Sequence, residues 1–119
     1  MKIAISSQGD NLKAPIDPRF GRAQSFIVYD TENDNFEYME NTQNLNLPQG
    51  AGIQTAQNIA KSGAKAVVSG HIGPKAFSAL SKGGIEIYFA SAGSVEEAVE
   101  AFKQGLLEKA DNADKPGHW

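Results

Sequence analysis

The chain has 119 residues, of which 40% are hydrophobic and 21% charged, values typical of one globular domain. Its formal net charge is -3, so the molecule as a whole lacks the basic character of a nucleic-acid-binding protein. It contains no cysteine, which excludes disulfides, thiol catalysis and an iron–sulfur cluster held by the protein's own thiolates.

The first element is a short apolar segment, residues 2–6, which predicts a strand. This segment becomes polar too quickly for the apolar core of a secretory signal. The sequence also contains no apolar run of about eighteen residues, the length that a membrane span requires. We therefore expect no membrane partner and a cytoplasmic location.

Residues 7–23 follow with glycine, proline and asparagine and without a helical period. Loops of this length are uncommon in small domains and are often functional. Because the segment has few apolar anchors, we expect it to be mobile until a ligand binds. Residues 24–30 are rich in β-branched and aromatic residues and predict a second strand. Phe36, Tyr38 and Glu40 alternate weakly and predict a third strand, which is joined to the second as a hairpin and followed by a polar loop.

The second half of the chain alternates predicted helices and strands. A buried strand is expected over residues 66–69 and a further strand over residues 85–89, and helices end at Gly63 and before Gly83. Ser94 and Glu97 have the spacing of a capping box at the start of a third helix. The apolar stripes of the three helices are Ile53, Ala56, Ile59 and Ala60; Ala76, Phe77 and Leu80; and Val95, Ala98, Val99, Phe102 and Leu106.

This order predicts an α/β fold with a five-stranded mixed sheet, three main helices and helices on both faces of the sheet. We expect one domain over residues 1–109 and a polar tail over residues 110–119. Ligands of such sheets bind at the carboxyl ends of the parallel strands. The segments that should meet there are 6–22, 49–53, 70–74 and 90–94.

Three of these segments open helices and contain glycine. Gly50 and Gly52 around Ala51, and the glycines on both sides of His71, would let a ligand approach the backbone closely. The free N–H groups of a helix N-terminus favour an anion. The alternative interpretation is that these glycines only make tight turns.

The two arginines of the chain, Arg19 and Arg22, both lie in the long loop, where they flank a phenylalanine and a glycine. A guanidinium group offers a planar fork of donors that suits large anions. Two such groups in one loop favour one side of an anion pocket. The alternative is that both pair with surface carboxylates of the same loop, Asp10 or Asp17.

His71 lies at a strand-to-helix turn and has three alternative roles. It could ligate a metal through a neutral nitrogen, donate to an anion when protonated, or cap backbone groups. Residues for catalysis are sparse, because a two-metal nuclease needs three or four converging carboxylates and the sequence has neither these nor a nucleophile elbow. The residues thus predict a site that holds an anion without transforming it.

Four segments, 1–6, 15–23, 50–56 and 70–77, resemble the dinitrogenase iron–molybdenum cofactor biosynthesis family. This family includes nitrogenase accessory carriers and the orange protein, which holds a molybdenum–copper sulfide cluster; the chain is most similar to the orange-protein subgroup. The resemblance implies a ribonuclease-H-like α/β/α sandwich with one antiparallel strand. It also implies non-enzymatic binding or carriage of an anionic molybdenum-containing metal–sulfur cluster, of the molybdenum–copper sulfide or iron–molybdenum cofactor type.

One position departs from the family pattern. In the nitrogenase carriers a histidine implicated in cofactor binding often precedes the Phe-Gly pair, and this chain has Arg19 there. Charge pairing to the cluster would then replace ligation from this loop. Such a cluster brings its own sulfide and needs no protein thiolate, which agrees with the absence of cysteine.

We expect residues 1–109 to form the cluster-binding domain. Its expected partners are the cluster and a protein that donates or receives it, with no nucleic acid. The alternative function is a sensor that binds a nucleotide or sugar phosphate at the same helix N-termini. The expected cofactor-binding residues are Ser6, Arg19, Phe20, Gly21, Arg22, Gly50, Ala51, Gly52, His71, Ile72 and Gly73, with His71 as the candidate metal ligand.

Overall fold

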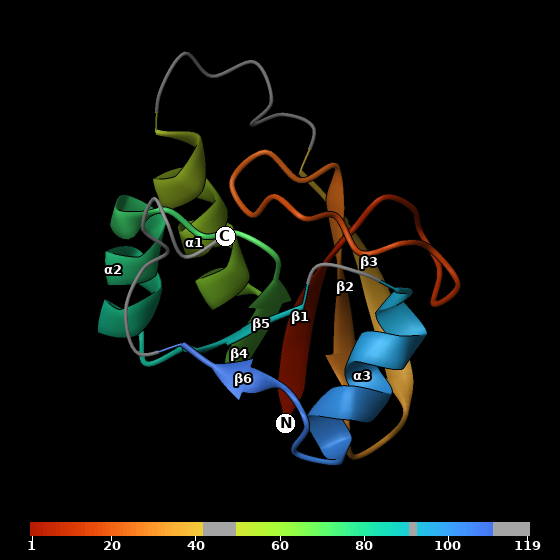
Figure 1. The fold of residues 1–119 in the computed structure, drawn as a ribbon. Helices are drawn as coiled ribbons and strands as arrows, with labels where there is room; N and C mark the ends of the chain where they lie inside the picture. Colours follow the sequence, from red (N-terminus) through yellow and green to blue (C-terminus); the bar gives the residue numbers. More distant parts are fainter. Residues whose placement is uncertain (42–49, 91–92, 111–119) are drawn as a thin grey trace.

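The structure, a computed structural model, describes residues 1–41, 50–90 and 93–110. A mixed sheet forms the middle layer, with α1 and α2 on one face and α3 on the other (Figure 1). The strands are β1 Lys2–Ser7, β2 Ser25–Asp30, β3 Asn35–Glu40, β4 Ala66–Ser69, β5 Glu86–Phe89 and β6 Glu108–Lys109. The helices are α1 Ala51–Lys61, α2 Pro74–Lys82 and α3 Val95–Lys103.

The strand order is β3-β2-β1-β4-β5-β6. β1, β4 and β5 are parallel, while β2 runs against β1 and β3, and β6 runs against β5. The predicted three-layer α/β fold is confirmed. The sheet has six strands where five were expected, and two of them run against the rest. The additional strand, β6, has only two residues and both are charged, so it carries no apolar pattern.

Each face of the sheet packs against its own helices because strand side chains alternate between the two faces. On one face Ala4, Phe26 and Val67 pack with the apolar stripes of α1 and α2. On the other face Ile5 and Val68 pack with the stripe of α3. The central strands β1 and β4 are therefore buried on both sides, which explains their short, continuous apolar sequences.

Three predicted helix positions are wrong in detail. Leu106 was expected in the stripe of α3 but is 71% exposed. The helix ends at Lys103 and the backbone turns at Gly105, which has a φ of 72°. On α1, Ile53 and Ala60 face solvent, and the buried stripe passes through Thr55 instead. The capping box of Ser94 and Glu97 is confirmed.

The predicted polar tail lies outside the described residues except for Ala110, whose N–H donates to Ile87 O at 2.8 Å. Most of the predicted loop before α1 also lies outside them, over residues 42–49. In the part of the chain that the structure describes, no helix is both long and apolar enough to cross a membrane.

Candidate functional site

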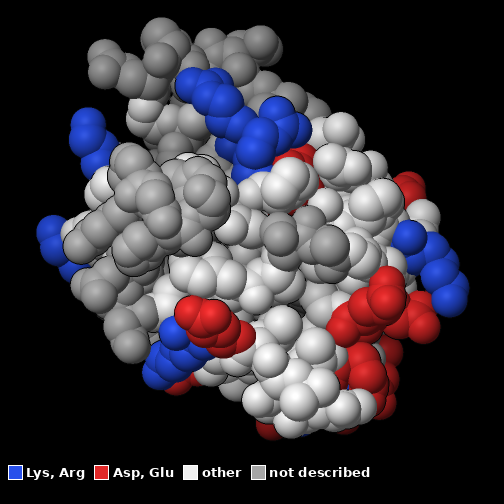
Figure 2. Space-filling view, viewed as in Figure 1, with Lys and Arg blue, Asp and Glu red and all other residues white. Residues whose placement is uncertain are grey.

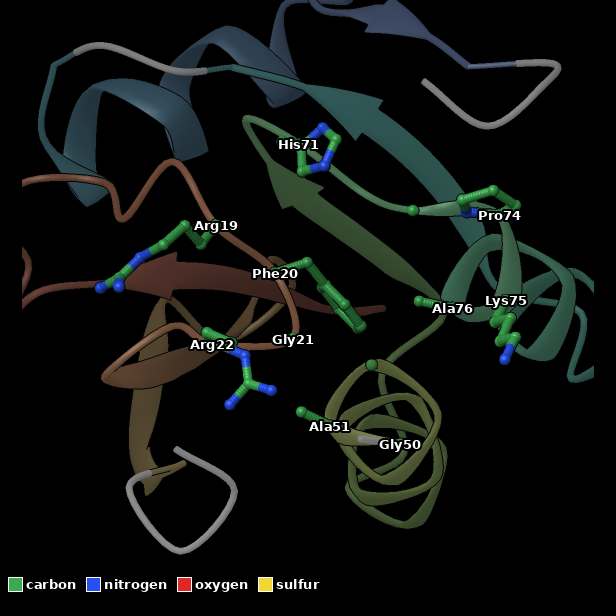
Figure 3. A pocket seen from close by; sticks show the side chains of 12 residues that line it. Arg19, Phe20, Gly21, Arg22, Gly50, Ala51, His71, Pro74, Lys75 and Ala76 are labelled. Atoms are coloured by element: carbon green, nitrogen blue, oxygen red, sulfur yellow. The ribbon is translucent and has the colours of Figure 1, made fainter. Parts of the chain in front are cut away.

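A pocket of about 540 Å³ opens where the long loop meets the N-termini of α1 and α2. Its walls come from three segments that are far apart in the sequence (Figure 3). The lining residues are Arg19, Phe20, Gly21, Arg22, Gly50, Ala51, Gly52, His71, Gly73, Pro74, Lys75 and Ala76. All of the predicted site residues except Ser6 and Ile72 are among them, and their part in binding stays a prediction.

The long loop is held in place by the buried carboxylate of Asp17. This carboxylate accepts the backbone N–H groups of Arg19 at 3.0 Å and Gln24 at 3.1 Å. It also accepts Nε of Arg19 at 3.1 Å and Nη2 at 3.2 Å. The hydrogen bond to Asp17 raises the pKa of the Arg19 guanidinium. For Arg19, pairing with a carboxylate is therefore what the structure shows.

The long loop also pairs with the backbone just after the end of β4. Arg19 and His71 pair as a parallel bridge, and the Phe20 N–H donates to His71 O at 3.2 Å. The Phe20 ring is buried and packs edge-on against Phe26, with ring centroids 5.5 Å apart. The loop thus contributes both a backbone edge and an aromatic anchor to the base of the pocket.

Ser6 and Ile72 lie beneath the surface and support the site from within. The Ser6 hydroxyl donates to Asp17 O at 2.6 Å and lies 3.0 Å from Ser69 Oγ. Ile72 is fully buried in the core under α1 and α2. The Ile16 N–H donates to Gly93 O at 3.0 Å, a further tether of the long loop. These contacts argue against the expectation that the loop is mobile.

Close backbone approach brings the walls of the pocket together. A Cβ atom on Gly21 would lie 2.9 Å from both Cα and N of Gly52. A Cβ atom on Gly52 would lie 3.1 Å from Cβ of Ala76. Glycine at these two positions lets the long loop pack against the start of α1, and α1 pack against α2.

Two buried polar side chains, which were not among the predicted site residues, hold this contact by hydrogen bonds. Asn41 Nδ2 and Thr55 Oγ1 each donate to Gly21 O at 3.2 Å. Asn41 Nδ2 also donates to Ala23 O at 2.9 Å, and Thr55 Oγ1 lies 3.2 Å from Asn41 Oδ1. Asn41 lies in no motif, and Thr55 lies in the segment 50–56 but bonds to a residue 34 positions away, so neither was predicted as a site residue.

The helix N-termini at the pocket differ from the third one. Within the described residues, neither α1 nor α2 has a side-chain cap or an acidic residue in its first turn. Their N-cap residues are Gly50 and Gly73. The N-terminus of α3 is not part of the pocket, and it has a full capping box with Glu96 and Glu97 in its first turn. The two helices at the pocket thus leave their N-terminal N–H groups and positive dipole ends available to an anion.

The charged side chains among the described lining of the pocket are all basic. Arg19, Arg22, Lys75 and His71 line it, and none of the described lining residues is acidic. In Figure 3 the Arg22 side chain extends toward the start of α1, whereas Arg19 extends away from His71. Sequence analysis missed Lys75, although its place in the first turn of a helix, where a cation is disfavoured, was a usable signal.

The donor set does not suit a bare metal ion. Among the residues that the structure describes, no three His, Cys, Asp or Glu side chains are close enough together to hold one. A metal at this pocket would therefore have to bring most of its own ligands. An anionic complex fits the basic side chains and the uncapped N-termini.

Comparisons with known proteins show the family and the fold of this chain. The sequence model of the dinitrogenase iron-molybdenum cofactor family matches residues 1–105. An uncharacterized protein of Methanocaldococcus jannaschii is 38% identical over 112 residues, covering 92% of this chain and 91% of that protein. The apo form of the orange protein from Desulfovibrio gigas has a TM-score of 0.93 and 40% identity over 96% of both chains. The NMR structure of a proposed NifB protein from Thermotoga has a TM-score of 0.85 and 34% identity over 98% of both chains.

Proposed function

We propose that this chain, which belongs to the dinitrogenase iron-molybdenum cofactor family, binds and carries an anionic molybdenum-containing metal–sulfur cluster and does not transform it. The observation that carries this proposal is the pairing of two uncapped helix N-termini in one pocket with basic side chains and, among its described lining, no carboxylate. The cluster is the transported molecule here, and residues 1–109 are the unit that holds it.

The physical basis is anion recognition. Backbone N–H groups at the starts of α1 and α2 would donate to sulfide or oxo groups at the cluster surface. Arg22 and Lys75 would add charge-assisted hydrogen bonds, which are about twice as strong as neutral ones. The pocket volume of about 540 Å³ lies in the usual range for small ligands.

The similarity to the orange-protein subgroup favours a molybdenum–copper sulfide cluster over an iron–molybdenum cofactor. A carrier must also exchange its cluster, so a donor or recipient protein belongs to the proposal. His71 lines the pocket at the end of β4, where it would either donate to the cluster or ligate a metal in it.

Reconstitution of the full chain tests this proposal. The apo protein is mixed anaerobically with tetrathiomolybdate and Cu(I) and desalted, and bound molybdenum and copper are then measured with the visible spectrum. We expect metal retained in fixed ratio to protein and a charge-transfer band. ATP and glucose 6-phosphate are titrated in parallel. Saturable binding of either one, without metal retention, would overturn the proposal and favour a nucleotide or sugar-phosphate sensor.

A further inference from the structure

The charges of this chain are segregated along the sequence and in space. Residues 41–85 contain no aspartate or glutamate, and their charged side chains are Lys61, Lys65, Lys75 and Lys82. The acidic residues lie before and after this segment, and three of them, Glu96, Glu97 and Glu100, lie within α3. The charged side chains of α1 and α2 are therefore all lysines, although the protein has a net charge of -3.

Figure 2 shows this segregation on one side of the molecule. Acidic side chains gather at the lower right, where Figure 1 places α3 and the β2–β3 hairpin. Basic side chains lie at the top, by the long loop, and along the left edge, near α2, while a further one lies at the right edge beside the acidic group. Acidic side chains thus predominate on the α3 side, where Lys13 and Lys103 pair with two of them, and lysines predominate on α1 and α2. Such a field orients a charged macromolecule as it approaches.

A groove runs along this basic face between α1 and α2. It is lined by Ile53, Pro74, Lys75, Ser78, Ala79 and Lys82. Ile53 is 38% exposed at its edge, although the rest of the apolar stripe of α1 faces the core or is small. The groove offers an apolar contact between two cationic ends.

The two lysines of the groove lie on one stripe of α2, seven residues apart. This separation is two helical turns, about 10.5 Å along the axis. Ser78 and Ala79 lie between them and are small, so another chain can come close. An acidic helix with carboxylates two turns apart and an apolar residue between them would match the groove.

Helix stabilisation accounts for Lys61 and Lys82 but not for Lys75. Lys61 and Lys82 lie in the last turns of α1 and α2, where a cation is favourable to the helix dipole. Lys75 lies in the first turn of α2, where a cation is unfavourable. It makes no ion pair with any residue in the described ranges.

We propose that the α1–α2 groove docks an acidic amphipathic helix of the protein that exchanges the cluster. The inference rests on the proposed function for the identity of that partner. Pro74 and Lys75 line both the groove and the cluster pocket, so a helix in the groove lies at the pocket's rim. Docking there would place the partner beside the cluster and would use the basic face to orient it.

The test uses the full-length apo protein labelled with ¹⁵N and two synthetic peptides of identical composition. One peptide has about five helical turns and carries, on one face, glutamates two turns apart with a leucine between them. The other peptide has the same residues in scrambled order. We expect the amphipathic peptide to bind at least about fivefold more tightly. Its binding should shift the amides of Ile53, Ser78, Ala79 and Lys82.

Three variants make the result specific. Ile53→Ser and Lys82→Gln each should weaken peptide binding by about two- to fivefold, because each removes one exposed contact. Lys13→Gln removes the same charge on the other side of the sheet, where Lys13 Nζ lies 3.1 Å from Glu96, and should have no effect. Equal binding of the scrambled peptide, or tighter binding of a single-stranded oligonucleotide, would overturn the inference.

The same variants separate this inference from the proposed function. Ile53 and Lys82 do not line the cluster pocket. If wild-type protein retains molybdenum but the amphipathic peptide does not bind the groove, the docking inference fails and the carrier function stands. If the peptide binds as expected and no metal is retained, the groove is a docking site and the carrier function fails.

Discussion

The Asp17 carboxylate holds the Arg19 guanidinium at two points, with Oδ1 3.1 Å from Nε and Oδ2 3.2 Å from Nη2. Because Asp17 is fully buried and Arg19 is half-exposed, the pair ties the surface of the long loop to its interior. The charge of Arg19 is thus largely compensated within the protein. Because the Arg22 side chain extends toward the start of α1 and Lys75 lies in the first turn of α2, these two residues should supply most of the cationic contribution to an anion in the pocket (Figure 3).

This relationship predicts different effects of neutralising the three cations. Arg22→Gln and Lys75→Gln each remove one charge-assisted hydrogen bond, about 1.5–3 kcal/mol, and should weaken cluster binding by roughly 10- to 150-fold. Arg19→Gln should weaken it clearly less. Molybdenum retention after equilibrium dialysis at graded concentrations measures all three. An Arg19→Gln loss as large as that of Arg22→Gln would show that Arg19 turns to the cluster on binding.

Replacing Asp17 should lower the stability of the fold, because its carboxylate holds the long loop in place. Asp17→Asn places an amide among four N–H donors and should lower the free energy of unfolding by about 1.5–3 kcal/mol. Asp10→Asn, an exposed change in the same loop, should stay within about 0.5 kcal/mol. Urea unfolding followed by circular dichroism gives both values. Indistinguishable midpoints would mean that the buried carboxylate does not fix the loop.

The contact of Gly21 with Gly52 predicts a steric effect. The methyl group of Gly21→Ala meets backbone atoms 2.9 Å away, so the loop must shift, at a cost of about 1–3 kcal/mol in stability. Gly73→Ala is the matched control in the same pocket, since its added Cβ meets nothing within 4 Å. With its φ of -72°, Gly73→Ala should change stability by less than about 1 kcal/mol, because the lower entropy of the unfolded chain offsets the poorer N-cap preference of alanine. Thermal unfolding that ranks the two variants in the opposite order would contradict the close approach.

The loop's hydrogen bonds predict protection without a ligand. The N–H groups of Ile16, Asp17 and Phe20 donate to Gly93 O, Ser6 O and His71 O at 2.9–3.2 Å. Their amide exchange in the apo protein should be much slower than that of Asn11, an exposed residue of the same loop. Exchange of all four at similar fast rates would restore the picture of a loop that orders only on binding.

Local patterns in the sequence were sufficient to predict the fold class but not the long-range hydrogen bonds that hold the site together. The apolar runs of β1 and β4 and the capping box at Ser94 are local signals, and the structure confirms them. The Asn41 and Thr55 bonds to Gly21 join residues 20 and 34 positions apart, so no local pattern marks them. Strand β6 depends on where the chain turns after α3, and two charged residues carry no strand signal.

The most direct test of the central claim is the position of the metal in the loaded protein. A crystal of the chain reconstituted with tetrathiomolybdate and Cu(I), measured at the molybdenum absorption edge, locates the metal by anomalous scattering. We predict one peak in the pocket between Gly52 at the start of α1 and Lys75 at the start of α2. A peak outside this pocket, or metal held by surface carboxylates, would contradict the proposal that uncapped helix N-termini and basic side chains hold the cluster.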